Sequence, residues 1–273
     1  MALYIGTNSA SLSAQRSLIS SQNNLQTSFE RLSSGSRINS AADDAAGLAI
    51  ASRLKAQASG LQVAQRNAAN GVSLVETADS ALGTMTDLLT RGRDLVLQYS
   101  DGTLSASDKT AIDAELTDIN TELERVRTKT SFAGVDLLNG AVTTGLGGTS
   151  VSIGIDAAGT TVAVALDTAF DGMTFASTDA LSNSKTVAAI DTLIDEVNAQ
   201  RASFGALANT FQSAIENLAA VEQGVTAAAG RIMDTDFARE SAELAKNQIL
   251  QQAGTSILAQ ANQSTQSVLS LLQ

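Results

Sequence analysis

Proline is absent from all 273 residues of this chain, whereas proteins use it on average at about 5% of positions. Because a proline ring breaks the interior of an α-helix, its absence leaves the chain free to form long, unbroken helices. Cysteine, histidine and tryptophan are also absent, and aromatic residues make up only 3%. The core that such a chain can build is aliphatic, which is typical of helical bundles and coiled coils rather than of ligand pockets.

Apolar residues recur every three or four positions along most of the chain, which is the pattern of helices with one buried stripe. In the first segment, leucines follow one another at intervals of seven, and a second segment runs from about residue 44 to 98. A third begins after Ser105 and Asp108, which have the spacing of a capping box. Further helices are predicted over about 186–229 and from about 236 to the end.

The segment between about 131 and 183 lacks this helical period. Within it, the sequence VSIGIDAAGTTVAVAL at 151–166 alternates around a turn, which predicts a β-hairpin. The sequence GLGGTS at 145–150 is glycine-rich, but no Lys-Ser or Lys-Thr follows it, so we interpret it as a loop rather than a phosphate site. We therefore expect a mainly α fold, in which long antiparallel helices form a coiled-coil or helical-bundle rod with a small central β-hairpin region and nested, discontinuous domains.

Both ends of the chain avoid ionised side chains, since none occurs before Arg16 and none after Lys246. The polar residues there are amides and hydroxyls, which can be buried without the desolvation cost of an ion. Two interpretations are open: the ends pair with each other in a single chain, or they pack among several copies. We expect them to be loose in a single chain and to become helical on assembly. The net charge of −11 argues against nucleic acid and anionic membranes as partners.

Four stretches of the sequence resemble a known family. RLSSGSRINSAADDAAGLAIASRLKAQ (31–57) and GLQVAQRNAANGVSLVETADSAL (60–82) are similar to the N-terminal region of bacterial flagellin, and residues 201–218 and 231–273 are similar to its C-terminal region. The resemblance implies a subunit that polymerises into the tubular filament of the bacterial flagellum. It also implies that the terminal helices pair and line an inner tube, and that a helical rod with a β-hairpin forms the next shell. On this basis we expect no enzymatic activity and no catalytic, cofactor or metal site.

The resemblance predicts an inner shell formed by residues 1–42 with 234–273, a middle rod formed by 43–139 with 184–233, and a small insert at 140–183 with no large outer domain. The residues expected to drive polymerisation of the inner shell are Leu18, Leu25, Phe29, Leu32, Leu250, Ile257, Leu258, Val268, Leu269 and Leu272. Those expected to pack the rod are Ile112, Leu116, Ile119, Leu123, Val126, Phe204, Phe211 and Ile215. Serine and threonine are frequent in the insert, where we favour a soluble loop over O-glycosylation.

Several partners are implied by the same resemblance. The C-terminal helix would bind a flagellar export chaperone in the cytoplasm, and the unfolded chain would pass through a type III flagellar export apparatus to the extracellular filament. Filament cap and hook-junction proteins would adjoin it there. No signal peptide is expected, because the start MALYIGTNSASLSAQ has neither a basic region nor a continuous apolar run. No uncharged apolar stretch is long enough to predict a transmembrane helix.

The sequence TRGRDLVLQ resembles the flagellin segment that an innate immune receptor recognises, and that also packs between protofilaments. By matching position, Arg91, Leu95 and Glu115 would contact the receptor. Gly92 and Asp94 depart from the family's usual aliphatic residue and glutamate. A role in packing between subunits is therefore the alternative to receptor recognition.

A hook–filament junction protein of the same superfamily and an unrelated extracellular coiled-coil adhesin are the alternatives to a filament subunit. A flagellin with an inserted metalloprotease is excluded, because that insert holds zinc through two histidines and the chain has none. The acidic pair Asp43 and Asp44 follows Asn39 and Ser40. We interpret this pair as a helix N-terminal cap rather than as a cation or acid–base site.

Overall fold

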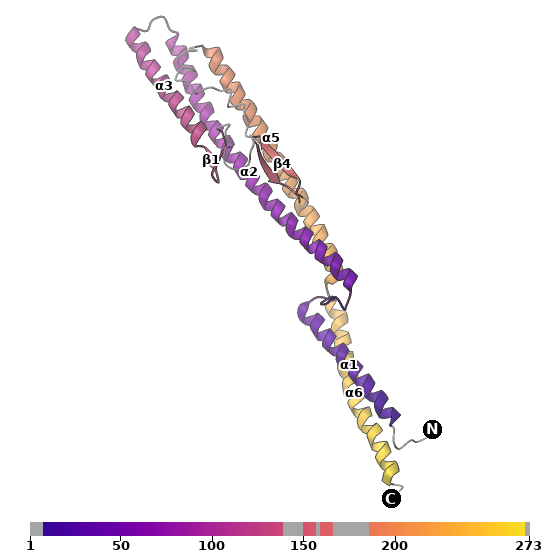
Figure 1. Ribbon diagram of the computed structural model, residues 1–273. Coiled ribbons are helices and arrows are strands. Elements are labelled where there is room, and N and C mark those ends of the chain that lie inside the picture. Colours follow the sequence, from indigo (N-terminus) through magenta and orange to yellow (C-terminus); the bar gives the residue numbers. More distant parts are fainter. Residues whose placement is uncertain (1–7, 139–149, 157–158, 166–185, 271–273) are drawn as a thin grey trace. The chain divides into compact units, whose positions relative to one another are not determined.

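The computed structural model describes residues 8–138, 150–156, 159–165 and 186–270 (Figure 1). The chain divides into two compact units, of which unit 1 comprises residues 1–56 with 224–273 and unit 2 comprises residues 57–223. Two long helices, α2 (Ala45–Tyr99) and α5 (Val187–Met233), contribute residues to both units. In the described part of the chain, no helix is both long and apolar enough to cross a membrane.

Unit 2 contains three long helices and two small hairpins. α3 (Ala106–Lys129) lies beside α2, and ion pairs join α2 to both α3 and α5 (Figure 1). The antiparallel hairpins consist of β1 (Ser131–Phe132) with β2 (Val135–Asp136), and of β3 (Ser150–Gly154) with β4 (Thr161–Ala165). The predicted helices and the predicted β3–β4 hairpin are therefore confirmed, with ends that differ by a few residues.

The core of unit 2 is aliphatic, with two phenylalanines. All the expected apolar positions of α3 are buried, and Leu116 and Leu123 have 0% exposed surface. Phe204 and Phe211 of α5 are also buried, and Ile215 packs partly buried against the same core. The stripe that α2 contributes consists of Ala68, Leu74, Val75, Ala78, Leu82, Met85, Leu89, Leu95 and Val96.

The β3–β4 hairpin joins this core through the buried side chains of Ile153 and Val164. A Cβ atom on Gly71 of α2 would lie 2.8 Å from Ile153 Cδ1 and 3.1 Å from the ring of Phe211. Glycine at position 71 therefore allows the hairpin and α5 to pack directly against the backbone of α2.

The start of α3 has the predicted capping box. Ser105 Oγ accepts a hydrogen bond from Asp108 N at 3.3 Å, and Ser105 N donates to Asp108 Oδ2 at 3.0 Å. The Ser105 hydroxyl also donates to Asp108 Oδ2, at 2.6 Å, and this bond lowers the pKa of Asp108. Two orphan donors at the helix end are thus satisfied reciprocally.

Of the acidic pair before α2, Asp44 acts as a cap, as predicted, whereas Asp43 closes the turn that precedes the helix. Asp44 Oδ1 accepts a hydrogen bond from Gly47 N at 2.8 Å, which satisfies a free donor of the first turn. Asp43 Oδ2 accepts from Ser40 N at 2.9 Å and from Asn39 N at 3.0 Å. These bonds, with that from Ser40 the stronger influence, lower the pKa of Asp43.

Unit 1 is built around two antiparallel helices, α1 (Ser9–Ser34) and α6 (Phe237–Ser270), which lie side by side (Figure 1). Near the end of α1 and the start of α6, Arg31 Nη1 lies 3.8 Å from Glu240 Oε2. The structure therefore agrees with one of the two open interpretations, in which the two ends pair with each other within one chain. The hypothesis that this pair orders only on assembly stays a prediction.

A short backbone pairing closes unit 1 where the two helices begin and end. Gly35 ends α1 with a φ of +69°, a left-handed conformation that favours glycine. Arg37 N then donates to Met233 O at 2.6 Å, and Thr235 N donates to Gly35 O at 3.0 Å. Arg37 Nη2 also donates to Ile232 O at 2.8 Å. These bonds tie the segment after α1 to the segment before α6.

The β1–β2 hairpin is the one described element that the sequence pattern does not predict. Its turn residues Ala133 and Gly134 have φ values of +52° and +83°, as a type I′ turn requires. Each strand is only two residues long, so no alternating pattern flanks the turn. Residues 145–149 of the expected glycine-rich loop, and the Ser/Thr-rich residues 166–185, lie outside the described residues.

Candidate self-association surface on the terminal helices

α1 and α6 meet along one seam with heptad spacing. Seam positions step by three and four residues on both helices, and every member is buried or partly buried. This spacing is that of a two-stranded coiled coil. The seam consists of Ser11, Ala14, Leu18, Ser21, Leu25, Ser28 and Leu32 on α1, and of Glu240, Leu244, Asn247, Gln251, Gly254, Leu258 and Ala261 on α6.

Small and polar residues make this seam narrow. A Cβ atom on Gly254 would lie 3.0 Å from Leu18 Cδ1, so the helices approach closely at that point. The most buried members are polar: Ser11, Ser28 and Asn247 are 8%, 4% and 5% exposed. Within the described side chains of α1 and α6, no large apolar residue is as fully buried. The pair is thus held together with little of the apolar burial that stabilises unit 2.

Hydrogen bonds between polar side chains and the partner helix fix the register of the pair at the chain ends. Ser11 Oγ donates to Asn262 Oδ1 at 2.9 Å, and Asn8 Nδ2 donates to Ala261 O at 3.0 Å. Asn8 Oδ1 accepts from Ser11 N at 3.0 Å and so also caps α1. Amides and hydroxyls therefore make these interhelix hydrogen bonds at the chain ends without any ionised side chain.

Seven large apolar side chains of the pair point away from the seam. They are between 46% and 65% exposed, and we call them the outward apolar set: Leu12, Ile19, Phe29, Phe237, Ile249, Leu250 and Ile257. In the described part of unit 2, which is the longer unit, the large apolar residues with comparable exposure are Val63, Leu97 and Val221. Exposed apolar surface is therefore concentrated on the terminal helices.

Part of the outward apolar set forms a second stripe beside the seam. Leu12 and Ile19 are seven residues apart on α1, and Leu250 and Ile257 are seven residues apart on α6. A helix with two heptad stripes can pack against a second helical neighbour in addition to its first. Because the seven side chains are about half exposed, burying the rest of their surface would contribute about 6–10 kcal/mol.

The residues expected to drive polymerisation divide between the two surfaces. Leu18, Leu25, Leu32 and Leu258 lie on the seam and are partly buried, and Leu18 lies beside Gly254 of the partner helix. Phe29, Leu250 and Ile257 belong to the outward apolar set. Val268 and Leu269 lie on the described backbone of α6 but their side chains do not belong to the described residues, and Leu272 lies outside them altogether.

Several residues of this surface are not singled out by the sequence pattern. They are the polar seam residues and four of the outward apolar set, Leu12, Ile19, Phe237 and Ile249. The sequence signal that could have found the polar members on α1 is the phase of the leucine heptad at Leu18, Leu25 and Leu32, because steps of three and four from these leucines reach positions 11, 21 and 28. A search for apolar residues alone passes over serine, asparagine and glycine at seam positions.

The residues matched to the immune-receptor segment lie on unit 2. Arg91 Nη2 of α2 lies 2.6 Å from Glu115 Oε1 of α3, and the two side chains are 59% and 44% exposed. Leu95 is 3% exposed and belongs to the core. Of the three, only Arg91 and Glu115 therefore offer surface to a partner. Among the described residues, no three Asp or Glu side chains gather as metal ligands do.

Comparison with known proteins gives matches along nearly the whole chain. The family model of the bacterial flagellin N-terminal helical region matches residues 5–143, and that of the C-terminal helical region matches residues 187–272. Polar flagellin F of Vibrio parahaemolyticus is 35% identical over 377 aligned positions that cover all of both chains. The flagellar filament 33 kDa core protein of Treponema phagedenis is 36% identical over 286 positions, covering 99% of this chain and 100% of that protein. A crystal structure of Bacillus cereus flagellin matches with a TM-score of 0.48 and 29% identity, over 56% of this chain and 88% of that one.

Proposed function

This chain belongs to the bacterial flagellin family and is a structural subunit of the flagellar filament, and on that premise we propose that copies polymerise through the α1–α6 pair. The outward apolar set is the observation that carries this proposal, because its side chains remain about half exposed in the single chain. Neighbouring copies that pack their terminal helices against one another would remove this surface from water.

The absence of ionised side chains near the chain ends is consistent with helices that are buried on several sides. From Asn247 to the end of the described helix at Ser270, α6 carries no ionised side chain. Amides and hydroxyls can hydrogen-bond inside an assembly, or face a water-filled channel, without the cost of burying a charge. The seam occupies one side of each helix, so the second stripe is left for helices of other copies.

The proposal is tested by replacing two members of the second stripe, Leu250→Gln and Ile257→Gln, in one chain. We expect a soluble variant that does not form filaments after seeding, measured by sedimentation and electron microscopy. Val221→Gln, at a 40% exposed position of unit 2, is the matched control and should polymerise like the unmodified chain. Polymerisation of the double variant at the wild-type critical concentration would overturn the proposal.

In the assembled filament, residues 1–42 with 234–273 form the inner shell, 43–139 with 184–233 form the rod, and 140–183 form a small insert of the rod. The spacing of the two family matches supports an insert of this size, because only residues 144–186 lie between them. The alignment with the Treponema protein supports it too, since it needs 286 positions for a chain of 273. No large outer domain is therefore assigned.

The filament that this family forms is extracellular. The chain reaches it through a type III flagellar export apparatus. In the filament, cap and hook-junction proteins adjoin the subunits. Before export, a flagellar chaperone holds the C-terminal helix in a groove, as an amphipathic helix is held. Exposed Ile249, Leu250 and Ile257 on α6 support this role. A truncated chain ending at Asp234 should lose chaperone binding in a pull-down, and retained binding would contradict the assignment.

We further propose that Arg91 and Glu115 contact an innate immune receptor. Their exposed ion pair supports a polar contact on the side of α2 and α3, whereas buried Leu95 would act only by supporting α2 from the core. A reporter-cell assay with purified monomer should respond to the unmodified chain and not to the Arg91→Ala, Glu115→Ala variant. No response to the unmodified chain at saturating protein would exclude the assignment.

A further inference from the structure

The two units differ sharply in charge. Unit 2 contains 21 carboxylate residues and 9 cationic residues, which gives a net charge of −12. Unit 1 contains 7 carboxylate residues and 8 cationic residues, which gives a net charge of +1. Most arginines of unit 2 form ion pairs with carboxylates of the same unit. These arginines are Arg91, Arg93, Arg125, Arg127 and Arg201. The excess carboxylates of unit 2 are thus left without cations of their own.

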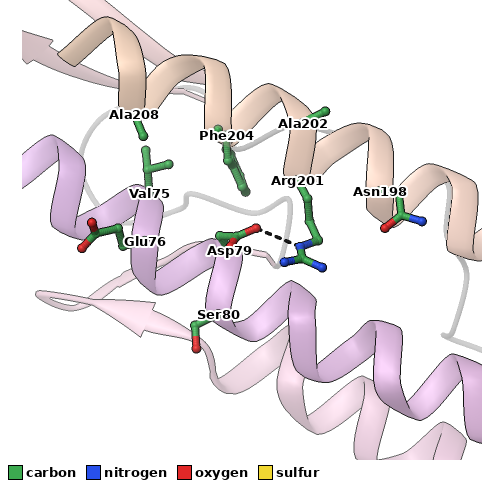
Figure 2. Close-up of a pocket in the computed structure, with 10 residues that line it drawn as sticks. Val75, Glu76, Asp79, Ser80, Asn198, Arg201, Ala202, Phe204 and Ala208 are labelled. Atoms are coloured by element: carbon green, nitrogen blue, oxygen red, sulfur yellow. Dashed lines mark hydrogen bonds and ion pairs between the residues drawn. The ribbon is translucent and has the colours of Figure 1, made fainter. Parts of the chain in front are cut away.

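A groove between α2 and α5 collects part of this excess (Figure 2). Its volume is about 500 Å³, and it is hollow because small residues line it, among them Ser80, Ala202, Gly205 and Ala208. Nothing lies within 4 Å of the position that a Cβ on Gly205 would take. Inside the groove, Arg201 Nε lies 2.9 Å from Asp79 Oδ1, so the one cation that faces it is already paired.

Three carboxylates continue along the same side of α2. Glu76 lines the groove, and Asp87 and Asp94 follow it by 11 and 18 residues, which places all three within about 20° on the helix surface. All three are exposed, and none forms an ion pair with another described residue. Asp87 also raises the pKa of Arg201 through its charge, although the hydrogen bond from Arg201 to Asp79 is the larger influence. We call this surface, with its three carboxylates, the acidic groove.

The first turns of α2 have the complementary character. Residues 45–56, the part of α2 in unit 1, contain two cations and no carboxylate. Arg53 is exposed and has no ion pair within the described chain. Ile50, three residues earlier and therefore on the same face, is 41% exposed. The neighbouring alanines at 46 and 49 keep this face of the helix narrow.

We propose that the first turns of α2 in one copy, around Ile50 and Arg53, dock in the acidic groove of a second copy. This contact rests on the self-assembly proposed above and names a second surface for it. A narrow helix face enters a groove lined by small side chains, and Arg53 meets carboxylates that form no ion pair with the described residues of their own chain. Because the two surfaces differ, the contact is heterologous, and repetition extends an open-ended row of subunits rather than closing a dimer.

Charge exchange tests this contact in the full-length chain at low ionic strength. Arg53→Glu alone, and Glu76→Lys with Asp87→Lys, should each raise the critical concentration for filament growth at least about tenfold, because like charges then face each other. The chain that carries all three substitutions should return to within about threefold of the unmodified chain, since the charges are again opposite. None of the three residues is buried or paired, so circular dichroism and thermal unfolding should show an unchanged fold.

Lys55→Glu is the matched control, because it makes the same charge change two residues away, about 200° around the helix. It should leave the critical concentration within about twofold of the unmodified chain, since it lies off the docking face. Equal defects from Arg53→Glu and Lys55→Glu, or no recovery in the triple variant, would overturn the docking contact. Failure of the unmodified chain to form filaments would instead overturn the self-assembly itself, so the two failures are separable.

Discussion

The two regions of this chain solve the same problem, packing long helices, in opposite ways. In unit 2, large aliphatic side chains such as Leu116 and Leu123 are fully buried, and arginines pair with carboxylates on the outside. In the α1–α6 pair the most buried residues are Ser11, Ser28 and Asn247, the leucines of the seam are only partly buried, and seven other large apolar side chains point outward. Unit 2 buries its large apolar side chains within one chain, whereas the terminal pair leaves seven of them about half exposed, which is the surface that the proposed assembly would bury.

Exchanging one phenylalanine for alanine in each region should give the largest contrast. Phe211→Ala removes a side chain with 0% exposure from the core of unit 2 and should lower the free energy of unfolding of the monomer by about 3–5 kcal/mol. Phe29→Ala removes a 51% exposed side chain and should change that free energy by less than about 0.5 kcal/mol. Urea denaturation of both variants is the measurement.

If the comparison holds, polymerisation should be affected by Phe29→Ala, the variant that hardly changes the free energy of unfolding of the monomer. Phe29→Ala should raise the critical concentration for polymerisation, because Phe29 belongs to the outward apolar set. A Phe29→Ala monomer destabilised as much as Phe211→Ala would show that the terminal pair has a core of its own, contrary to the comparison.

A larger side chain at two glycines should distinguish the narrow seam from the open surface of unit 2. Gly254→Leu places atoms against Leu18, whose Cδ1 would lie 3.0 Å from the new Cβ, and should destabilise the terminal pair by about 1–3 kcal/mol. Gly83→Leu on α2 is the control, because nothing lies within 4 Å of its new Cβ. The temperature at which filaments depolymerise should fall for Gly254→Leu only, and an equal fall for both would contradict a tight seam.

The capping box should make the start of α3 acid-sensitive. Ser105→Ala removes an N-cap hydroxyl and should lower the stability of unit 2 by about 1 kcal/mol at pH 7. Since the pKa of Asp108 is lowered in the folded chain, its contribution is present above the ordinary value of 3.8 and is lost as pH falls through the folded pKa. The difference between the two chains, followed by circular dichroism, should therefore shrink below about pH 4.

Residues 247–270 of α6 offer the internal comparison for this pH effect, because they carry no ionisable side chain. Exchange protection of α6 in the filament should therefore respond less to the same acid range than protection of α3. A Ser105→Ala defect that stays constant down to pH 2 would show that the Asp108 carboxylate adds nothing to the cap.

The smallest expected effect is at the β1–β2 turn. Ala133 has a φ of +52°, which an L-residue with a Cβ adopts at a cost, whereas Asn-Gly is the preferred pair for this turn. Ala133→Asn should raise the free energy of unfolding of unit 2 by about 0.5–1 kcal/mol and its melting temperature slightly. Ser131→Asn, on an exposed strand residue of the same hairpin, is the control and should bring no such gain. A loss of stability in Ala133→Asn would contradict the turn geometry.

The helices of this chain could be predicted because their signals are local. The missing prolines, the apolar spacing and the Ser105–Asp108 cap all act within a few residues, and the structure has α3 where they place it. The β1–β2 turn could not be predicted in this way, since its strands are two residues long and its left-handed Ala133 is an unusual choice. The burial of Leu137 and Leu138, directly after β2, fixes the path of the chain at this turn.

The candidate surface could be predicted only in part. Charge-free ends pointed to burial, but the partition of Leu18 to the seam and Leu250 to the outward face depends on which side of α1 meets α6. That choice is made by Gly254 and the serines, which apolar periodicity does not count. Similarly, the match to the family motif assigns Leu95 and Arg91 to the same contact surface. In the structure, Arg91 is exposed whereas Leu95 faces the core.

Hydrogen–deuterium exchange, compared between monomer and filament, tests most directly whether the terminal helices are completed by their neighbours. In the monomer, amides of α1 and α6 should exchange rapidly while core amides of α2, α3 and α5 in unit 2 are slow, and assembly should slow α1 and α6 by orders of magnitude. Slow exchange of α1 and α6 in dilute monomer, as slow as in unit 2 and unchanged in the filament, would contradict the account.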